Sequence, residues 1–399
     1  RQSPESRYRR FFSPKPELSD EEIEHFTNVD FVDRAAFVVE YRGEFVAWAS
    51  YERWRNRNDA EVAFMVDEEH HGKGIATLLL EHLAAVARSN GIERFTAQAL
   101  GDNRGMLSVF AKAGWPVQRR FDSGVIDVDF PLEDTTEFID SVERREQRAD
   151  SRAMARLLLP TAIAVIGASD EPGTVGEALW RNVSTTAACT VYPVNRRHET
   201  VGGRHAFDSV DDITEAVAMA IIAVPVAELR RVIDRCIAKQ VRGAIVVTTI
   251  NGVDDVIDMD ELVAHARRHG LRLIGPSSMG IVCTLAGNEL QATVAEGAVE
   301  AGGVAISMQS GTLGASVLRS AVGLGLGLSW FVSLGDKSDV SANDLLQFWQ
   351  DDDATKVIAL YTESLGNPRK LSRIARRVSA TKPIVAVGTG AGLLGVGNE

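Results

Sequence analysis

The sequence predicts an α/β protein built from three consecutive units. Short apolar segments typical of strands alternate with longer stretches that have helical spacing over most of the chain. From residue 160 onwards this alternation becomes regular, which is typical of a doubly wound parallel sheet. A length of 399 residues also corresponds to about two or three domains of ordinary size.

The first unit is predicted to span residues 1–131, followed by a linker helix over residues 132–159. Its strand-like segments are 35–41, 45–51, 60–66, 94–99 and 125–130, and its helical segments are 75–89 and 103–113. In the third strand, side chains alternate between faces, with Glu61 on one face and Val62 on the other. The linker is rich in charge and has apolar residues at helical spacing, from Phe138 to Leu157.

The second unit is predicted to span residues 160–298 and the third residues 299–399. Buried-strand patterns of the second unit lie at 162–166, 190–194, 218–224, 243–247 and 272–274, with helical stretches between them. The third unit begins with the strand 304–308 and continues with strands at 328–333, 356–361 and 383–387. We therefore expect a Rossmann-like domain followed by a second parallel α/β domain.

Composition narrows the class of protein. The net charge of −12 and the pI near 5.3 argue against a nucleic-acid partner, which favours a basic face. No apolar run is long enough to span a bilayer, so no membrane association is expected. Three widely spaced cysteines suit a reducing compartment, which indicates the cytoplasm. The chain begins at Arg1 without Met, so we expect a piece of a longer polypeptide.

A glycine-rich turn at residues 71–76, His-Gly-Lys-Gly-Ile-Ala, joins the strand that ends at Val66 to the long helix. Such a turn presents backbone N–H groups at the positive end of the helix dipole and predicts a pyrophosphate site. Gly74 permits close approach of a ligand to the backbone. The alternative is a simple tight turn. The adjacent His70 and His71 do not indicate a metal site, because no partner ligand stands at helical spacing.

Together with the stretch 103–115, Asn-Arg-Gly-Met-Leu-Ser-Val-Phe-Ala-Lys-Ala-Gly-Trp, the turn resembles the two signatures of the GNAT acyltransferase superfamily. The resemblance covers residues 1–131 and implies a GNAT fold whose first strand and most of whose first helix lie before Arg1. His71 departs from the Arg or Gln usual at that place. The resemblance implies acetyl-CoA binding by Val66, His71, Gly72, Lys73, Gly74, Ile75, Ala76, Asn103 and Phe110.

The closer resemblance is to bacterial protein-lysine acetyltransferases that carry an acyl-CoA-synthetase-like module. It implies that Glu61 is the general base. The reaction needs such a group, because a lysine amine with a pKa of about 10.4 is protonated at pH 7. The alternative for Glu61 is a solvated carboxylate at the start of a strand. The family's usual tyrosine acid is replaced by Phe110, so the general acid stays unassigned.

A second nucleotide site is predicted in the next unit. Ile166-Gly167-Ala168-Ser169 closes its first strand, and Asn195-Arg196-Arg197 follows its second. An NAD site favours an acidic group at the end of the second strand, whereas arginines at that position suit the ribose phosphate of CoA or NADP. The alternative is a solvated basic turn.

Further segments that contain glycine, serine, threonine or proline follow strands at 224–225, 248–249, 275–280 and 309–314, and it is their resemblance to a known family that favours CoA over NADP. Residues 160–399 resemble the CoA-binding and following, flavodoxin-like domains of NDP-forming acyl-CoA synthetases and succinyl-CoA ligase α subunits. The resemblance implies CoA at a second site formed by Gly167, Ala168, Ser169, Asn195, Arg196, Val224, Pro225, Pro276, Ser310 and Gly311. It also matches Glu363 to a Glu that contacts a phosphorylated histidine, which is expected just beyond Glu399.

The favoured hypothesis is an acetyl-CoA-dependent protein-lysine acetyltransferase whose ligase-like module senses CoA or acyl-CoA. The acceptor is a protein lysine, with an AMP-forming acyl-CoA synthetase as the candidate. The runner-up is a bifunctional protein whose C-terminal part is an NDP-forming acetate or acyl-CoA ligase. A third hypothesis is a non-catalytic CoA-sensing scaffold in which Glu61 is idle.

Overall fold

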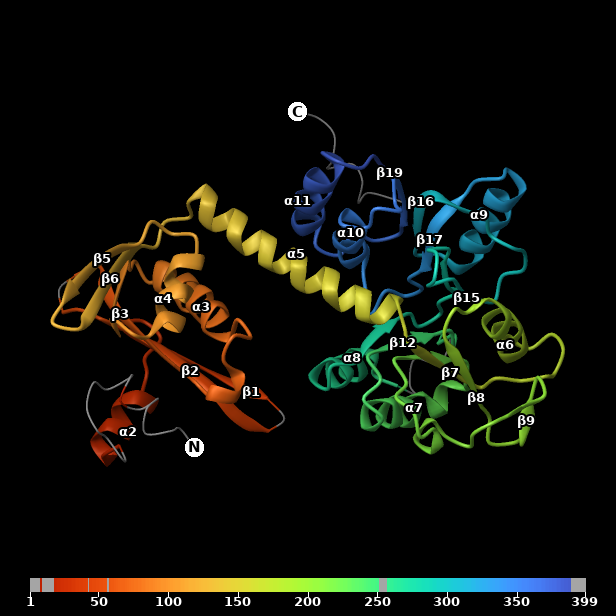
Figure 1. Ribbon diagram of the computed structural model, residues 1–399, viewed down its shortest axis with the longest axis horizontal. Coiled ribbons are helices and arrows are strands. Elements are labelled where there is room, and N and C mark those ends of the chain that lie inside the picture. The colour runs from red at the N-terminus through yellow and green to blue at the C-terminus, as the bar shows by residue number, and fades with distance from the viewer. Residues whose placement is uncertain (1–7, 9–17, 42, 56, 251–256, 389–399) are drawn as a thin grey trace. The chain divides into compact units, whose positions relative to one another are not determined.

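A computed structural model describes residues 8, 18–41, 43–55, 57–250 and 257–388 (Figure 1). The outer parts of the predicted first and third units, residues 1–7, 9–17 and 389–399, lie outside the described residues. The chain divides into two compact units, Arg1–Glu146 and Gln147–Glu399. Within the described ranges, no helix combines the length and apolarity needed to cross a membrane.

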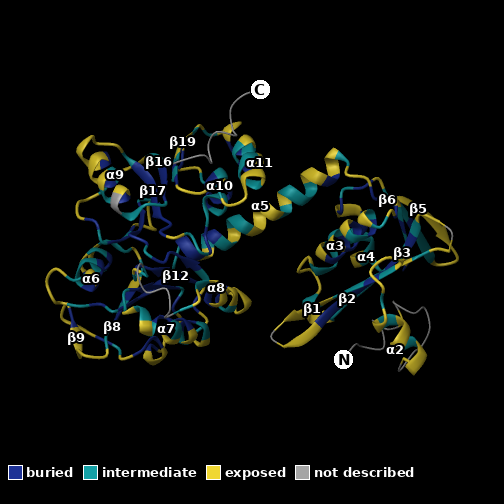
Figure 2. Cartoon of the chain, turned by 180° about the vertical axis from the view of Figure 1, so that it is seen from behind, coloured by how far each residue is buried: buried dark blue, intermediate teal, exposed yellow. Residues whose placement is uncertain are grey.

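The first unit is built on a six-stranded sheet in the order β1-β2-β3-β4-β6-β5. Its strands are β1 (Arg34–Tyr41), β2 (Glu44–Arg53), β3 (Asp59–Val66), β4 (Arg94–Leu100), β5 (Gln118–Asp122) and β6 (Val125–Pro131). The five predicted strands are confirmed. The sequence did not reveal β5, because this edge strand is exposed along its whole length and carries no apolar alternation (Figure 2).

Helices cover both faces of this sheet. The predicted helices are confirmed as α3 (Ile75–Ser89) and α4 (Arg104–Lys112), while α2 (Asp20–Thr27) and a short η1 (Glu68–His70) were not predicted. Leu80 and Leu83 of α3 pack in one core cluster with Ala49 of β2. The neighbouring Trp48 points to the opposite face, where Phe26 of α2 meets its ring edge-on at 5.4 Å. The two helices therefore cover opposite faces of β2.

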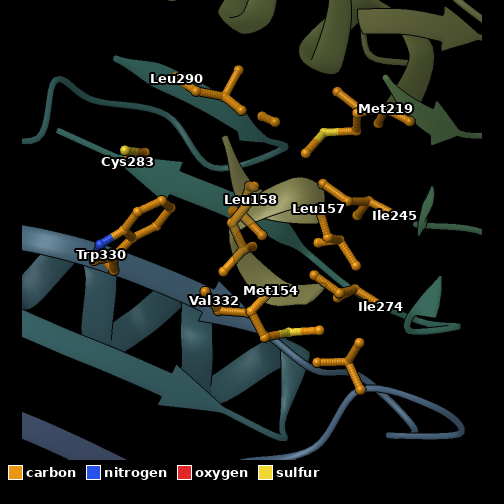
Figure 3. Packing of buried hydrophobic residues seen from close by; sticks show 14 of the residues in the cluster. Met154, Leu157, Leu158, Met219, Ile245, Ile274, Cys283, Leu290, Trp330 and Val332 are labelled. Atoms are coloured by element: carbon orange, nitrogen blue, oxygen red, sulfur yellow. The ribbon is translucent and has the colours of Figure 1, made fainter. Parts of the chain in front are cut away.

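The predicted linker helix is confirmed as a single helix, α5 (Thr136–Leu158). In the first unit, Phe138 of α5 stacks on Trp115 with ring centroids 4.0 Å apart. In the second unit, Met154, Leu157 and Leu158 are fully buried in the core (Figure 3). The two ends of the helix thus supply core side chains to different units.

The second unit contains a five-stranded parallel sheet in the order β13-β12-β11-β7-β8. Its strands are β7 (Ala162–Ile166), β8 (Thr190–Val194), β11 (Met219–Ile222), β12 (Gly243–Val246) and β13 (Arg272–Ile274), and its helices are α6 (Val175–Thr186), α7 (Val226–Ala238) and α8 (Met259–Arg268). A hairpin of β9 (Thr200–Val201) and β10 (Arg204–His205) and a short η2 (Val210–Asp212) lie between β8 and β11. The predicted doubly wound sheet is confirmed, and its strand order reverses between β7 and β11, where such folds bind ligands.

A second, six-stranded sheet has the order β15-β14-β17-β16-β18-β19. Its elements are β14 (Gly280–Cys283), β15 (Leu290–Thr293), β16 (Ala301–Met308), α9 (Gly311–Gly323), β17 (Leu328–Ser333), α10 (Ala342–Gln350), β18 (Val357–Thr362), α11 (Pro368–Ser379) and β19 (Ile384–Gly388). The predicted boundary at residues 298–299 falls between β15 and β16 of this one sheet. The four-residue strands β14 and β15 gave no signal in the sequence because they are so short.

The two sheets of the second unit share a buried core. Figure 3 shows Met219, Ile245 and Ile274 of the first sheet around the end of α5, with Trp330 and Val332 of the second sheet on its other side. All five side chains are fully buried.

Candidate functional site

A cavity opens where two strands of the first unit separate. β3 and β4 are parallel, but their pairing covers only Asp59–Glu61 with Arg94–Thr96. Beyond these residues β3 stays paired with β2 up to Val66, and β4 stays paired with β6 up to Leu100. The separated halves line a cavity of about 660 Å³. Their unpaired backbone groups can hydrogen-bond an extended ligand.

The glycine-rich turn forms one wall of this cavity. Gly72 and Gly74 adopt left-handed φ values of 73° and 83°, which side chains with a Cβ rarely adopt. A Cβ built on either glycine would meet no described atom within 4 Å, so open space lies over the turn. Gly74 is the N-cap of α3 and offers no side-chain acceptor to the helix N–H groups. The turn therefore fits an anion such as the pyrophosphate of CoA.

Most of the residues predicted to bind the cofactor line this one cavity. They are Val66, His71, Gly72, Gly74, Ile75, Ala76, Asn103 and Phe110. Lys73 is not among the lining residues, and its Nζ lies 3.2 Å from Nδ1 of His70. His71 Nε2 lies 3.0 Å from the Val66 carbonyl oxygen and must donate to it. This bond holds the His71 ring against the end of β3.

Asn103 and Phe110 shape the opposite wall, which is formed by α4. The Asn103 Oδ1 accepts a hydrogen bond from the Met106 N–H at 3.1 Å and so caps the helix. Phe110 is 1% exposed and packs edge-on against Phe64, with ring centroids 6.2 Å apart. Phe110 carries no hydroxyl, so it contributes apolar surface and no proton.

Glu61 occupies the last paired position before the strands separate. Its half-buried side chain lines the 660 Å³ cavity and also a smaller one of about 80 Å³. The smaller cavity is formed by residues of α2 and β2, including Phe26, Trp48 and Glu52. Glu61 therefore stands between two spaces, one beside the glycine-rich turn and one under α2.

A second carboxylate lies directly opposite Glu61 across the β2–β3 ladder, that of Glu52. His25 Nε2 contacts a Glu52 carboxylate oxygen at 2.9 Å, and Arg34 Nη1 contacts His25 Nδ1 at 3.0 Å. Because a guanidinium can only donate, Nδ1 accepts and the ring proton sits on Nε2. Like charges directly opposite each other are unfavourable, and a bound cation would relieve the repulsion.

Sequence reasoning missed three cations that line the large cavity: Arg104, Lys112 and Arg145. Arg145 comes from α5, outside both sequence signatures, and pairs with Glu81 of α3. Burial raises the pKa of the Glu81 carboxyl, and the Arg145 guanidinium opposes this shift. A sequence signal for Arg145 would have required knowing that α5 folds back against α3.

The second predicted site lies at the carboxyl ends of β7, β8 and β11, around a cavity of about 200 Å³. Gly167, Asn195, Arg196, Val224 and Pro225 line it, together with two arginines of α7 that the sequence did not single out, Arg231 and Arg235. Arg196 Nη2 donates to both carboxylate oxygens of Glu228 at 2.6 Å. Arg231 also pairs with Glu228, and Arg235 pairs with Asp211, so three arginines of this cavity already have acidic partners.

The remaining residues predicted for the second site do not line this cavity. The Ala168 carbonyl accepts from Asn195 Nδ2 at 2.7 Å, and Ser169 Oγ accepts from the Glu171 N–H at 2.9 Å. Both thus shape the turn after β7. Pro276, Ser310 and Gly311 lie instead at the carboxyl ends of β13 and β16. They follow different strands of two sheets, which the sequence pattern alone could not separate.

Within the described ranges, no cluster of three or more histidine, cysteine, aspartate and glutamate side chains could hold a metal ion.

Comparison with known families agrees with the order of these units. Residues 4–115 match the acetyltransferase (GNAT) family, residues 161–284 match a CoA binding domain, and residues 301–396 match the succinyl-CoA ligase like flavodoxin domain.

Individual relatives match different parts of the chain. Acetyltransferase Pat of Mycolicibacterium smegmatis is 36% identical over 142 residues, which are 34% of this chain and 42% of that protein. The alpha subunit of Acetate--CoA ligase [ADP-forming] II of Pyrococcus furiosus is 36% identical over 235 residues, 58% of this chain and 50% of the subunit. The chain thus spans about half the length of these relatives.

A solved structure matches part of the chain. Dinucleotide forming Acetyl-coenzyme A synthetase 1 of Ca. Korarchaeum cryptofilum, in complex with phosphate and ADP, aligns with a TM-score of 0.56 at 35% identity. The alignment covers 59% of this chain and 52% of that chain. The present chain therefore carries a GNAT-family acetyltransferase domain, followed by the CoA-binding and succinyl-CoA-ligase-like domains of an NDP-forming acyl-CoA synthetase-like module.

Proposed function

We propose that this chain is a protein-lysine N-acetyltransferase that binds acetyl-CoA in the 660 Å³ cavity of its first unit. The observation that carries the proposal is the position of Glu61, at the point where β3 and β4 separate and between the two cavities. A carboxylate at that place can reach an amine that approaches a thioester held beside the glycine-rich turn.

The chemistry requires a base. A lysine side chain with an ordinary pKa of about 10.4 is protonated at pH 7 and cannot attack a carbonyl carbon. Glu61 accepts the proton from the acceptor ammonium, and the neutral amine then acts as the nucleophile. Bound acetyl-CoA would supply the thioester carbonyl that the amine attacks. The C–S bond would break as the C–N bond forms, and CoA would leave as its thiol with a proton given up by the attacking nitrogen. The backbone N–H groups of residues 72–76 hold the pyrophosphate and fix the position of the thioester end.

The smaller cavity under α2 suits the acceptor. Trp48 and Phe26 give it an aromatic wall, which favours both the methylene stem and the charge of a lysine side chain. Glu52, held by His25, adds a second negative charge beside Glu61. The substrate class is therefore a protein lysine, and an AMP-forming acyl-CoA synthetase is the candidate acceptor.

The second unit binds CoA or acyl-CoA as a regulatory module in this proposal. The 200 Å³ cavity lies beside the strand-order reversal of a doubly wound sheet and at the N-terminus of α7. Arg196, Arg231 and Arg235 supply the positive charge that a ribose phosphate requires.

The test is incubation of the chain with acetyl-CoA and a purified AMP-forming acyl-CoA synthetase, followed by mass-spectrometric mapping of acetyl-lysines. We expect acetylation at defined lysines that depends on the chain. Acetyl-lysine levels equal to those of a mixture without the chain, for this acceptor and for a whole-proteome extract, would contradict the proposal.

A second candidate function is favoured by the 36% identity to an ADP-forming acetate–CoA ligase subunit. In this alternative the complete protein also makes acyl-CoA through a phosphohistidine. The sequence has no histidine after His269, so we expect the 399-residue chain to form no phosphohistidine. Incubation with acetate, CoA and labelled ATP tests this, and an acid-labile phosphoprotein would favour the ligase.

A further inference from the structure

Arg145 links helix α5 to the cofactor cavity of the first unit. Its side chain is 33% exposed and lines the 660 Å³ cavity, although the residue lies thirty positions beyond the end of the matched acetyltransferase segment, 4–115. Its Nη1 donates to the carbonyl oxygen of Lys112, the last residue of α4, at 2.9 Å. Its Nη2 pairs with a carboxylate oxygen of Glu81 on α3. The guanidinium is thus fixed between the two helices that form the cavity wall.

Two bonds leave much of this guanidinium unused. Arginine carries five N–H donors in a planar fork, and the bonds to Glu81 and Lys112 use one donor on each terminal nitrogen. The Arg145 Nε is buried without a hydrogen-bond partner among the described residues. The two bonds also leave the second donor of each terminal nitrogen unused, and the side chain is 33% exposed, so the guanidinium can bind an additional anionic ligand.

The position of Arg145 selects one phosphate of CoA. The turn of residues 72–76 is suited to the pyrophosphate, at the N-terminus of α3. Glu81, which holds Arg145, lies six residues beyond Ile75 and therefore about 9 Å along the helix axis. The ribose separates the 3′-phosphate from the pyrophosphate by a span of this order.

Charge favours the same assignment. Lys112 and Arg145 bring two positive charges to this end of the cavity, and Glu81 offsets one of them. A phosphate monoester carries about 1.5 to 2 negative charges at pH 7 and is the stronger partner.

We propose that Arg145, on the linker helix α5, binds the 3′-phosphate of CoA in the acetyltransferase cavity. This inference rests on the proposed binding of acetyl-CoA there. It makes α5 part of the cofactor site, so that acetyl-CoA binding restrains the same helix whose C-terminal residues, including Leu157, lie in the core of the second unit.

The test compares acetyl-CoA with 3′-dephospho-acetyl-CoA on the whole chain. Hydrogen exchange of the peptide containing residues 72–80 reports binding at this cavity alone, so the second CoA site does not interfere. We expect the wild type to prefer acetyl-CoA by about ten- to hundredfold, the usual range for hydrogen bonds to charged groups. Amides of residues 140–146 should also gain protection with acetyl-CoA and less with the dephospho compound.

Arg145→Gln should abolish the preference, and Arg145→Lys should restore part of it. The matched control is Arg144→Gln, an exposed neighbour that does not line the cavity. Glu81→Gln removes the ion pair but keeps the guanidinium, and it should retain the preference. A preference that survives Arg145→Gln, or that is lost equally in Glu81→Gln, would overturn the inference. Absence of protection of residues 72–80 by either compound would instead remove the proposed acetyl-CoA site.

Discussion

The two cavities proposed to bind CoA differ in what the glycines beside them contact. In the acetyltransferase unit, a Cβ on Gly72 or Gly74 would meet no described atom within 4 Å. In the CoA-binding domain, a Cβ on Gly167 would lie 2.2 Å from the Ala223 carbonyl oxygen, and one on Gly176 would lie 2.0 Å from the Gly167 carbonyl oxygen. The first pair leaves room for a ligand, whereas the second pair lets protein backbones approach each other.

The cations of the two cavities differ as well. Arg145 pairs with Glu81 through one terminal nitrogen and donates to the Lys112 carbonyl oxygen through the other. One terminal nitrogen of Arg196, by contrast, contacts both carboxylate oxygens of Glu228. A ligand must compete with an internal carboxylate at both cavities, and the two cavities differ in how that carboxylate is bound. A glycine-rich turn after a strand predicted a phosphate site equally well in both units. The atoms around each glycine determine whether it leaves space for a ligand or allows two backbone segments to pack closely.

For the comparison of the two cavities, the largest expected effect is that of Gly176→Ala. The added methyl group would collide with the Gly167 backbone, which cannot move without displacing Ala223. We expect a loss of about 3 kcal/mol in the free energy of unfolding of the second unit. The matched control is Gly173→Ala, which has a φ of 80° but open space around its Cβ, and should cost about 1 kcal/mol. Urea unfolding monitored by hydrogen exchange of β7 measures the loss of unfolding free energy in both variants. Equal losses would contradict the packing role of Gly176.

A somewhat smaller effect is expected for Gly74→Glu in the first unit. The new side chain would occupy the space over the turn and bring a negative charge to the pyrophosphate position. We expect acetyl-CoA affinity at this cavity to fall by at least about a hundredfold, or about 2.7 kcal/mol. Gly91→Glu is the control, because Gly91 has a similar φ of 76° at the other end of α3 and does not line the cavity. Unchanged protection of residues 75–80 by acetyl-CoA in Gly74→Glu would remove the turn from the site.

The smallest effect is expected for Arg196→Ala at the second cavity. Because Arg196 is already paired with Glu228, its removal should weaken CoA binding by only about tenfold. Calorimetry on the Gly74→Glu chain isolates this second site. The control is Arg230→Ala on α7, which does not line the cavity. A preference for NADP over CoA, or no loss in Arg196→Ala, would contradict the assignment.

Much of the fold followed from local patterns. Buried strands such as β7 and β11 are continuous apolar runs, and α3 has regularly spaced leucines, so both were predictable. The strand β5 was missed because it is fully exposed, and α2 because it buries no residue and begins with a capping box, Ser19 with Glu22, that precedes no apolar run. Such elements are specified by their neighbours more than by their own sequence.

Some residues of the two candidate sites could likewise be predicted from a local motif, and others could not. Glu61 and the turn of residues 71–76 lie close together in the chain, so a motif could indicate them. Arg145 and Arg231 reach their cavities only through the docking of α5 and α7, which no short pattern encodes. Conversely, Pro276 and Ser310 share the strand-end pattern of Gly167 without sharing its cavity.

The central claim, that Glu61 is the base of an acetyl transfer to lysine, is tested most directly by Glu61→Gln. This variant keeps the shape of the side chain but cannot take a proton at neutral pH. We expect kcat to fall by about 10²- to 10⁴-fold while acetyl-CoA protects residues 72–80 as in the wild type. Glu69→Gln, an exposed neighbour outside the cavity, should retain full activity. An unchanged kcat in Glu61→Gln, with cofactor binding intact, would contradict the account.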